Sequence, residues 1–263
     1  MNLGIKGKRA IVLGASKGLG YACAEALSAE GVQVVAASSS VERCEEAAEK
    51  IRKATGGKVV PALGDVSDPD NMDRLYEAAV KALGGVDILI NNHGGPARGL
   101  AQDLKEEDLE SQFTSMVVSP IRLTSLCFPG MVERKWGRIL TIGSSGNVQP
   151  LPNMVLSNTL RMAMVGYTKT LAGELAADNV TVNIVAPGSV LTDRSREGTE
   201  STARRLNISF DEALQQRASS IPAHRMGEPS EFGALAAFLC GERAAYMTGS
   251  VWRVDGGAIR NIL

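Results

Sequence analysis

The chain has 263 residues, of which 44% are hydrophobic and 22% charged, and its formal net charge at pH 7 is −1. This balance is typical of a globular protein with a sizeable core, and it excludes strong electrostatic attraction to nucleic acid or to a membrane surface. The sequence shows no signal-peptide pattern and no run of about 18 apolar residues, so we expect a cytoplasmic protein.

Short apolar runs alternate with longer helical patterns along the whole chain. The runs predict strands at 9–14, 32–37, 58–63, 86–91, 138–143, 180–186 and 250–255. The longer patterns predict helices near 18–30, 40–54, 69–83, 106–134, 153–177 and 229–240. Asp68 before Pro69, and Ser39 with Glu42 as a capping box, are typical helix starts. Because nearly continuous apolar strands alternate with helices, the sequence predicts a single α/β domain. We expect a Rossmann-type doubly wound sheet of about seven parallel strands, with helices on both faces.

One segment departs from this alternation. Residues 193–225 form a polar insertion between the sixth strand and the last predicted helix. The stretch SFDE at 209–212 is a second capping-box pattern, which predicts a short helix within the insertion. Since long insertions after strand ends commonly shape ligand sites, we expect a lid over a substrate site, and a decorative surface loop is the alternative.

The ligating residues of a metal centre are scarce. The chain has two histidines, and its four cysteines (Cys23, Cys44, Cys127 and Cys240) are scattered without a CxxC pair. Zinc sites and disulfide frameworks need clustered or paired ligands. We therefore expect no metal site.

A glycine loop follows the first predicted strand. In VLGASKGLG, the residues Gly14, Gly18 and Gly20 stand between that strand and the next helix. Glycines at these places permit a tight turn and let the backbone approach a pyrophosphate at the helix N-terminus. The loop therefore predicts dinucleotide binding, with a packing turn as the alternative.

The end of the second strand bears on which dinucleotide is bound. Sites that prefer NAD carry Asp or Glu there, which bonds the ribose 2′-hydroxyl. This chain has Ser38, Ser39 and Ser40 instead, and Lys17 in the glycine loop can attract a 2′-phosphate. We therefore expect NADP(H) to be favoured over NAD(H).

With these motifs, the chain resembles the short-chain dehydrogenase/reductase family over its whole length. GASKGLG, GDV (64–66), NNHGG (91–95), GRILTIGSS (137–145), APGSVLT (186–192) and YMTGSVWRVDGG (246–257) carry the likeness. The pattern is most similar to 3-oxoacyl-acyl-carrier-protein-reductase-like members. The resemblance implies a small-molecule substrate, no nucleic acid or membrane partner, and a homo-oligomer, a tetramer in many members.

The resemblance also implies a set of site residues. Asp65 falls where the family contacts adenine, Thr192 where it holds the nicotinamide carboxamide, and Ser144 at its catalytic serine. The cofactor-binding residues expected in this way are Gly14, Ser16, Lys17, Gly18, Leu19, Gly20, Ser38, Ser39, Asp65, Val66, Asn92, Gly94, Pro187, Gly188, Val190 and Thr192.

The catalytic positions depart from the family. Its reductases carry Tyr-x-x-x-Lys thirteen residues after the serine, and this chain has Ser157 and Arg161 there, with Met116 aligned to the catalytic Asn. Serine is a much poorer acid than tyrosine, and arginine stays protonated but can anchor hydroxyls, carboxylates or an oxyanion. We predict that Ser144, Ser157 and Arg161 form the active site, with Ser144 as the hydrogen-bonding partner of Arg161.

Three functions remain open. The first is an NAD(P)(H)-dependent oxidoreductase that interconverts carbonyls and alcohols, in which Ser144 and Arg161 stabilise an oxyanion and water relays the proton through Ser157. The second is a non-redox enzyme on the same fold, a dehydratase or isomerase, in which Arg161 binds an anionic substrate. The third is a catalytically inactive nucleotide-binding protein.

Two other features have competing interpretations. His93 has a side chain that titrates near neutral pH, but its place after the fourth strand favours a structural or cofactor-lining role over that of an acid. The arginines of the insertion (Arg194, Arg196, Arg204, Arg205, Arg217 and Arg225) are interspersed with acidic residues. This mixture favours a solvated face of mixed charge over an acidic-substrate site.

Overall fold

Seven strands form one parallel sheet in the computed structural model, which describes residues 2–261. The order is β3-β2-β1-β4-β5-β6-β7. The strands are β1 (Arg9–Leu13), β2 (Gln33–Ser38), β3 (Val59–Leu63), β4 (Ile88–Asn91), β5 (Gly137–Ile142), β6 (Val180–Pro187) and β7 (Val251–Val254). The predicted doubly wound fold is therefore confirmed, with strand ends that differ from the predicted ones by one or two residues.

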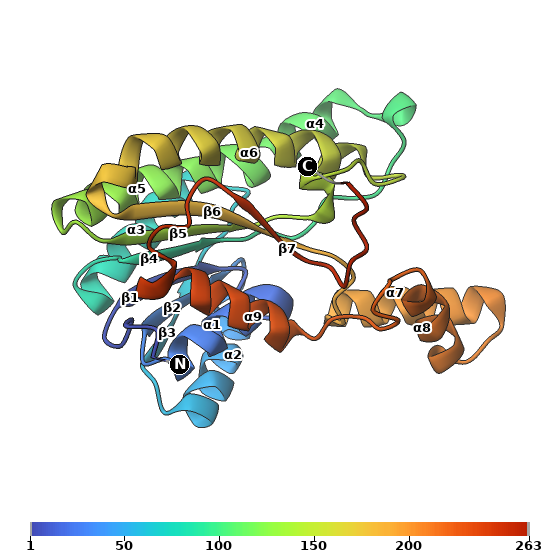
Figure 1. Cartoon of the computed structure of the whole chain (residues 1–263), viewed down its shortest axis with the longest axis horizontal. Coiled ribbons are helices and arrows are strands. Elements are labelled where there is room, and N and C mark those ends of the chain that lie inside the picture. Colours follow the sequence, from blue (N-terminus) through green and yellow to red (C-terminus); the bar gives the residue numbers. More distant parts are fainter. Residues whose placement is uncertain (1, 262–263) are drawn as a thin grey trace.

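Helices cover both faces of the sheet (Figure 1). One layer holds α1 (Gly18–Ala29), α2 (Val41–Thr55) and α9 (Pro229–Leu239), and the other holds α3 (Pro69–Leu83), α5 (Ser119–Glu133) and α6 (Val155–Leu175). The period of two along β1 explains how one strand serves both cores. Ala10 and Val12 pack in the first core, while Ile11 and Leu13 pack in the second.

The strand order reverses at β1. Its two neighbours in the sheet are β2 and β4, so the connections that leave β1 and β4 run in opposite directions. In open α/β sheets, this reversal leaves a crevice at the carboxyl ends of the strands, where ligands bind. The glycine loop follows β1 and the NNHGG segment follows β4, so both expected cofactor motifs border that crevice.

Helix starts agree with the sequence in two cases and differ in one. The Asp68 side chain accepts from the backbone N–H of Asp70, and Ser209 forms a capping box with Glu212, as predicted. The predicted Ser39 cap is wrong. Ser40 is the N-cap of α2, because its Oγ accepts from the N–H of Arg43, while Ser39 is exposed.

The predicted helix at 106–134 is interrupted. It consists of α4 (Glu106–Phe113), a π-helical turn (Thr114–Val118) and α5, and Pro129 lies inside α5. The stretch Glu106–Glu133 has the length of a membrane span and contains an 18-residue window with a mean hydropathy of 1.3, and 44% of that window is buried in the protein. Because α5 packs in a core shared with α3 and the sheet, we interpret the stretch as a core helix.

The polar insertion holds two helices rather than one. These are α7 (Asp193–Leu206) and α8 (Phe210–Ser219), which pack on each other and extend beyond the end of the sheet (Figure 1). The sequence signal for α7 was weak, since its residues are mostly polar and its cap, Thr192, belongs to the preceding turn.

Candidate functional site

The glycine loop is shaped by close backbone contacts. Gly14 and Gly18 adopt left-handed φ angles of 61° and 62°. A Cβ atom at Gly20 would lie 2.2 Å from the carbonyl oxygen of Gly14, so no side chain fits there. The amide of Asn92, after β4, donates to the same carbonyl at 3.5 Å and joins the two halves of the crevice.

The N-terminus of α1 is open to an anion. Lys17 is its N-cap residue, in extended conformation, and among the described residues no side chain caps the helix. The first backbone N–H groups of a helix lack intrahelical acceptors and attract phosphate. The loop and helix start therefore fit the diphosphate of a dinucleotide.

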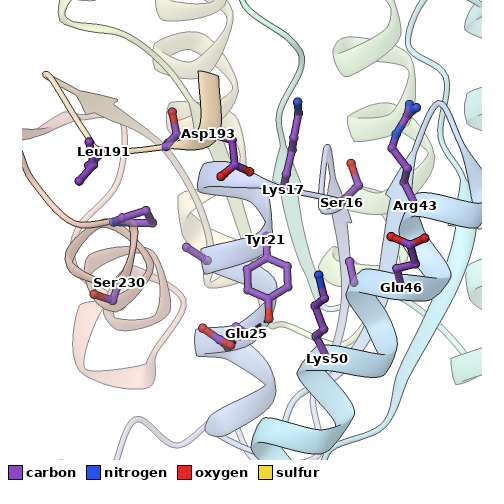
Figure 2. Close-up of a pocket in the computed structure, with 15 residues that line it drawn as sticks. Ser16, Lys17, Tyr21, Glu25, Arg43, Glu46, Lys50, Leu191, Asp193 and Ser230 are labelled. Carbon is purple, nitrogen blue, oxygen red and sulfur yellow. Dashed lines mark hydrogen bonds between the residues drawn. The ribbon is translucent and has the colours of Figure 1, made fainter. Parts of the chain in front are cut away.

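A pocket of about 480 Å³ lies beside this helix start. It is lined by Ser16, Lys17, Gly18 and Thr192 of the expected residues, together with residues of α1, α2 and the start of α9. Figure 2 shows the side chains of Lys17 and Arg43 extending in the same direction at one end of the pocket, with Ser16 between them. Glu25 and Lys50 lie toward the other end, where the hydroxyl of Tyr21 donates to Glu25 at 3.1 Å.

Arg43 was missed at the sequence level. Its guanidinium donates to the Oγ of Ser39 at 3.4 Å and lines the pocket next to the serines that replace the acid. The available signal was a basic residue in the first turn of the helix after β2. Because Arg43 and Lys17 are both cations, this end of the pocket has the charge that a 2′-phosphate requires.

Ser38 is less available than expected. It is 6% exposed, its Oγ donates to the carbonyl of Ser40 at 3.0 Å, and it accepts from the thiol of Cys44 at 3.1 Å. These bonds fix the turn between β2 and α2. Of the predicted pair, Ser39 alone offers an exposed hydroxyl.

Most of the remaining predicted cofactor residues lie in loops that follow parallel strands. After β3, Asp65 accepts from the N–H and Oγ of Ser67, and the carbonyl of Val66 accepts from Ser119. After β4, Gly94 is exposed.

In and after β6, the carbonyl of Pro187 accepts a hydrogen bond from Ser145, and Val190 forms a β-bridge with Gly227. A Cβ at Gly188 would lie 2.7 Å from Asp255, and Leu19 is half-buried in α1.

Thr192 has a structural partner already. It is the N-cap of α7, and its Oγ1 accepts from the backbone N–H of Ser195 at 3.4 Å. A Cβ at Gly18 would lie 3.6 Å from the Thr192 methyl group, so the loop after β6 closes onto the glycine loop. This contact brings the first and the sixth strand ends to the same crevice.

Ser144 stands at the end of β5 in a fixed loop. Its Oγ accepts from the N–H of Gly146 at 3.1 Å, and its own N–H donates to Asn147 Oδ1 at 2.7 Å. Asn147 Nδ2 donates in turn to the carbonyl of Arg161 at 3.0 Å. Asn147, which was also missed, therefore joins the serine loop to α6, and the capping pattern SSGN was its signal.

Ser157 and Arg161 meet on the buried face of α6. Arg161 Nε donates to Ser157 Oγ at 3.1 Å, and its Nη1 donates to the carbonyl of Ile142 at 2.9 Å. The two residues are 1% and 9% exposed. The predicted bond between Arg161 and Ser144 is therefore wrong, because the guanidinium reaches the strand two residues before that serine. The predicted water relay also lacks a route here, since Ser157 has almost no solvent access.

Met116 is the residue that the sequence resemblance aligns with the family's catalytic Asn. It lies in the π-helical turn, is 1% exposed, and packs with Leu156, Leu160 and Met164 of α6. An apolar side chain in this packing cannot carry a proton, so the helix irregularity is present without the polar group.

The charged residue that affects the pKa of Arg161 is another cation, Arg194. Burial, with a contribution from Arg194, lowers the pKa of Arg161 to about 10, so it remains protonated at neutral pH. Burial and the Arg161 charge lower the pKa of His93 to about 3. His93 Nδ1 lies 2.6 Å from the carbonyl of Gly94, which only accepts, so the proton is on Nδ1. His93 is therefore a neutral imidazole at neutral pH, which disfavours it as the missing acid.

The fold is that of a Rossmann-type protein whose glycine loop fits a dinucleotide. A family model described as enoyl-(acyl carrier protein) reductase matches residues 14–258. The chain belongs to the short-chain dehydrogenase/reductase family.

Individual relatives match over nearly their full length. The 3-oxoacyl-[acyl-carrier-protein] reductase FabG of Vibrio cholerae is 32% identical, with 97% of this chain and 98% of the relative covered. The NADPH-dependent reductase BacG of Bacillus subtilis is 32% identical, with 97% and 99% covered. The crystal structure of L-sorbose reductase from Gluconobacter frateurii, complexed with NADPH and L-sorbose, has a TM-score of 0.95 at 33% identity, with both chains covered fully.

Proposed function

We propose that this chain is an NADP(H)-dependent oxidoreductase that interconverts carbonyl and alcohol groups, similar to 3-oxoacyl reductases, with a non-standard acid/base site. The observation that carries the proposal is the open N-terminus of α1 beside the cations Lys17 and Arg43. The relatives named as NADPH-dependent or solved with NADPH support the same cofactor.

Candidate binding residues can be named for each part of the cofactor. Backbone N–H groups from Ser16 to Gly20 would hold the diphosphate, and Lys17 and Arg43 the 2′-phosphate. The loops after β3 and β4, with Asp65 and Asn92, would border the adenosine. Thr192 would hold the carboxamide, and Arg161 the ribose on the nicotinamide side. When bound, this cofactor supplies or accepts the hydride.

Arg161 would stabilise the negative charge that develops on the carbonyl oxygen. Its position is fixed by Ser157 and Ile142, which leaves Nη2 without a partner among the described residues and not enclosed by protein. A preorganised donor in a buried site needs no reorganisation as charge develops. The half-buried hydroxyl of Ser144 would donate a second bond to the same oxygen.

Ser157 would then be a positioning residue. Its Oγ accepts from Arg161 Nε, and its burial separates it from solvent. The proton would come from water at the open side of the site, near Ser144. Loss of a positioned general acid typically costs about 10²- to 10⁴-fold in rate, so we expect slow turnover compared with Tyr-bearing relatives.

We also propose that residues 193–225 act as a lid over this end of the crevice. Arg194 at the start of α7 donates to the carbonyls of Gly95 and Pro96 at 3.0 and 3.4 Å. These bonds hold α7 against the loop after β4. An exposed arginine with two carbonyl acceptors is a contact that can open and close.

The proposed function is tested by cofactor oxidation. The protein is incubated with NADPH or NADH and a panel of ketones and oxo acids, and absorbance of the reduced cofactor is followed. Consumption that depends on the carbonyl compound supports an oxidoreductase. Tight NADPH binding without any consumption would instead support the inactive nucleotide-binding alternative, and substrate turnover without net cofactor change would support a dehydratase or isomerase.

A further inference from the structure

Four arginines gather at the lid end of the crevice. Arg161 comes from α6, Arg194 from the start of α7, Arg217 from α8, and Arg98 from the loop after β4. The pKa of Arg161 is lowered by burial and by the Arg194 charge, and the pKa of Arg217 by burial and by the Arg98 charge. The charges of Arg161 and Arg194, and those of Arg217 and Arg98, are therefore near enough to oppose each other's protonation, although the residues come from different elements.

None of these four arginines has an acidic partner among the described residues. The ion pairs of the described part of the chain involve other arginines and lysines. Arg161 binds Ser157 and a carbonyl, Arg194 binds two carbonyls, and Arg217 binds the Ser195 carbonyl and Thr199 Oγ1. Each partner is neutral, so the positive charge is not compensated.

The uncompensated charge of Arg161 is unfavourable for the folded protein when no anion is bound. The residue is 9% exposed, and a buried charge without a counter-ion loses hydration that no ion pair replaces. Its Nη2 has no hydrogen-bond partner in the described part of the chain and is not enclosed by protein. A site with these properties is suited to an anion that enters from the crevice.

Resting on the proposed function, we infer that the carbonyl substrate carries a carboxylate, which is held between Arg161 and Arg194 beneath the lid. The two N–H groups of Arg161 Nη2 can bond one carboxylate oxygen and the reacting carbonyl oxygen, and Arg194 supplies a second positive charge for the carboxylate. Arg98 and Arg217 add positive potential at the entrance. The arginines of the insertion were expected to form a solvated face, and Arg194 is exposed as expected, but it bonds the loop after β4, while Arg217 is half-buried and bonds within the insertion.

The experiment compares acids with their own methyl esters. Initial rates of NADPH oxidation are measured with pyruvate, acetoacetate and levulinate and with the three esters, and with dihydroxyacetone and its phosphate. We expect at least one acid to have a KM about tenfold or more below that of its ester. Arg194→Gln should remove this preference, so that the KM values of acid and ester become similar whatever the variant does to the ester alone. Arg196→Gln, an exposed arginine on the same helix, is the matched control and should keep it.

The outcomes separate this inference from the proposed function. Equal use of acids and esters, unaltered by Arg194→Gln, leaves the oxidoreductase in place and overturns the carboxylate site. Preference for dihydroxyacetone phosphate over every carboxylate also overturns it. If no carbonyl compound is reduced, the proposed function fails, and calorimetry with the NADPH-saturated protein decides the anion site. Acid binding that Arg194→Gln weakens about tenfold supports the site, and no acid binding overturns it.

Discussion

Arg161 Nε donates to Ser157 Oγ across 3.1 Å, between two side chains one turn apart on α6 that are both almost fully buried. A pair on a solvated helix edge would be exposed and free to rotate. Here a guanidinium is held against the end of β5 by the carbonyl of Ile142 as well. The two positions that the resemblance aligns with the family's acid/base pair therefore hold a fixed cation and its hydroxyl partner.

Arg161→Ala should weaken NADPH binding and abolish turnover, because it removes the buried cation proposed to bind the ribose and the reacting oxygen. Arg161→Lys should restore part of the binding, since a point charge still reaches hydroxyls but loses the planar fork. Calorimetric titration and NADPH oxidation measure both effects. Glu174→Gln, exposed on the same helix, is the control. Unchanged affinity and activity in Arg161→Ala would mean that the pair has only a structural role.

The cofactor preference should depend on two side chains. Lys17→Ala and Arg43→Ala should each weaken NADPH about tenfold or more and leave NADH almost unaffected, because each removes a charge-assisted bond to the 2′-phosphate. Titration of both cofactors into each variant gives the ratio directly. Lys53→Ala, on the same helix but paired with Glu49, should change neither affinity. Tighter NADH than NADPH binding by the parent protein would refute the preference.

The insertion should respond to the cofactor. Amides of α7 and α8 should exchange rapidly in the free protein and slow when NADPH is bound, since the start of α7 borders the crevice through Thr192 and Arg194. Hydrogen exchange followed by mass spectrometry tests this. Amides of β5 serve as an internal reference that stays protected in both states. Strong protection of α7 and α8 without cofactor would exclude a lid.

The fold could be predicted because its signals are local and repeated. Apolar strands, helix periodicity and the glycine loop each depend on residues close in sequence, and all point to the same sheet. The site was predicted less completely, because its hydrogen bonds join distant segments. The partner of Arg161 proved to be the Ile142 carbonyl rather than Ser144, and Ser38 proved to be occupied within its own turn. A sequence motif does not show which backbone carbonyl a side chain will bond, or whether a local hydrogen bond will already occupy it.

His93 should make stability depend on pH. Its pKa falls from the usual 6.5 to about 3, by burial and by the Arg161 charge. Between these two values the unfolded chain binds a proton that the folded chain does not, so the free energy of unfolding decreases as pH falls from 6.5 toward 3. Denaturant unfolding in the upper part of this window, above the range where carboxylates titrate, measures the slope.

A substitution at His93 isolates that contribution. His93→Gln should flatten the slope, because it removes the titrating group and retains an amide donor. His224→Asn is the control, since His224 is exposed and its left-handed φ of 51° suits asparagine. An equal flattening in both variants would contradict the assignment to His93.

The last prediction tests whether the backbone around positions 157 and 161 of α6 still supports carbonyl reduction when these positions carry the family's Tyr and Lys. Ser157→Tyr combined with Arg161→Lys should raise NADPH-dependent reduction of simple ketones by about 10²-fold or more, because it supplies a positioned general acid. The bond from Asn147 runs to the backbone carbonyl of residue 161 and not to its side chain, so the frame does not depend on the guanidinium. Since Ser157 is 1% exposed, the smaller lysine at 161 must make room for the ring.

Ser157→Phe with Arg161→Lys is the matched control for this prediction, because it adds the ring without the hydroxyl and should show no gain. Circular dichroism and NADPH titration establish that both double variants are folded and competent to bind. A folded, NADPH-binding Tyr variant that reduces ketones no faster than the Phe variant would show that the crevice beyond α6 no longer places a carbonyl within reach of this position.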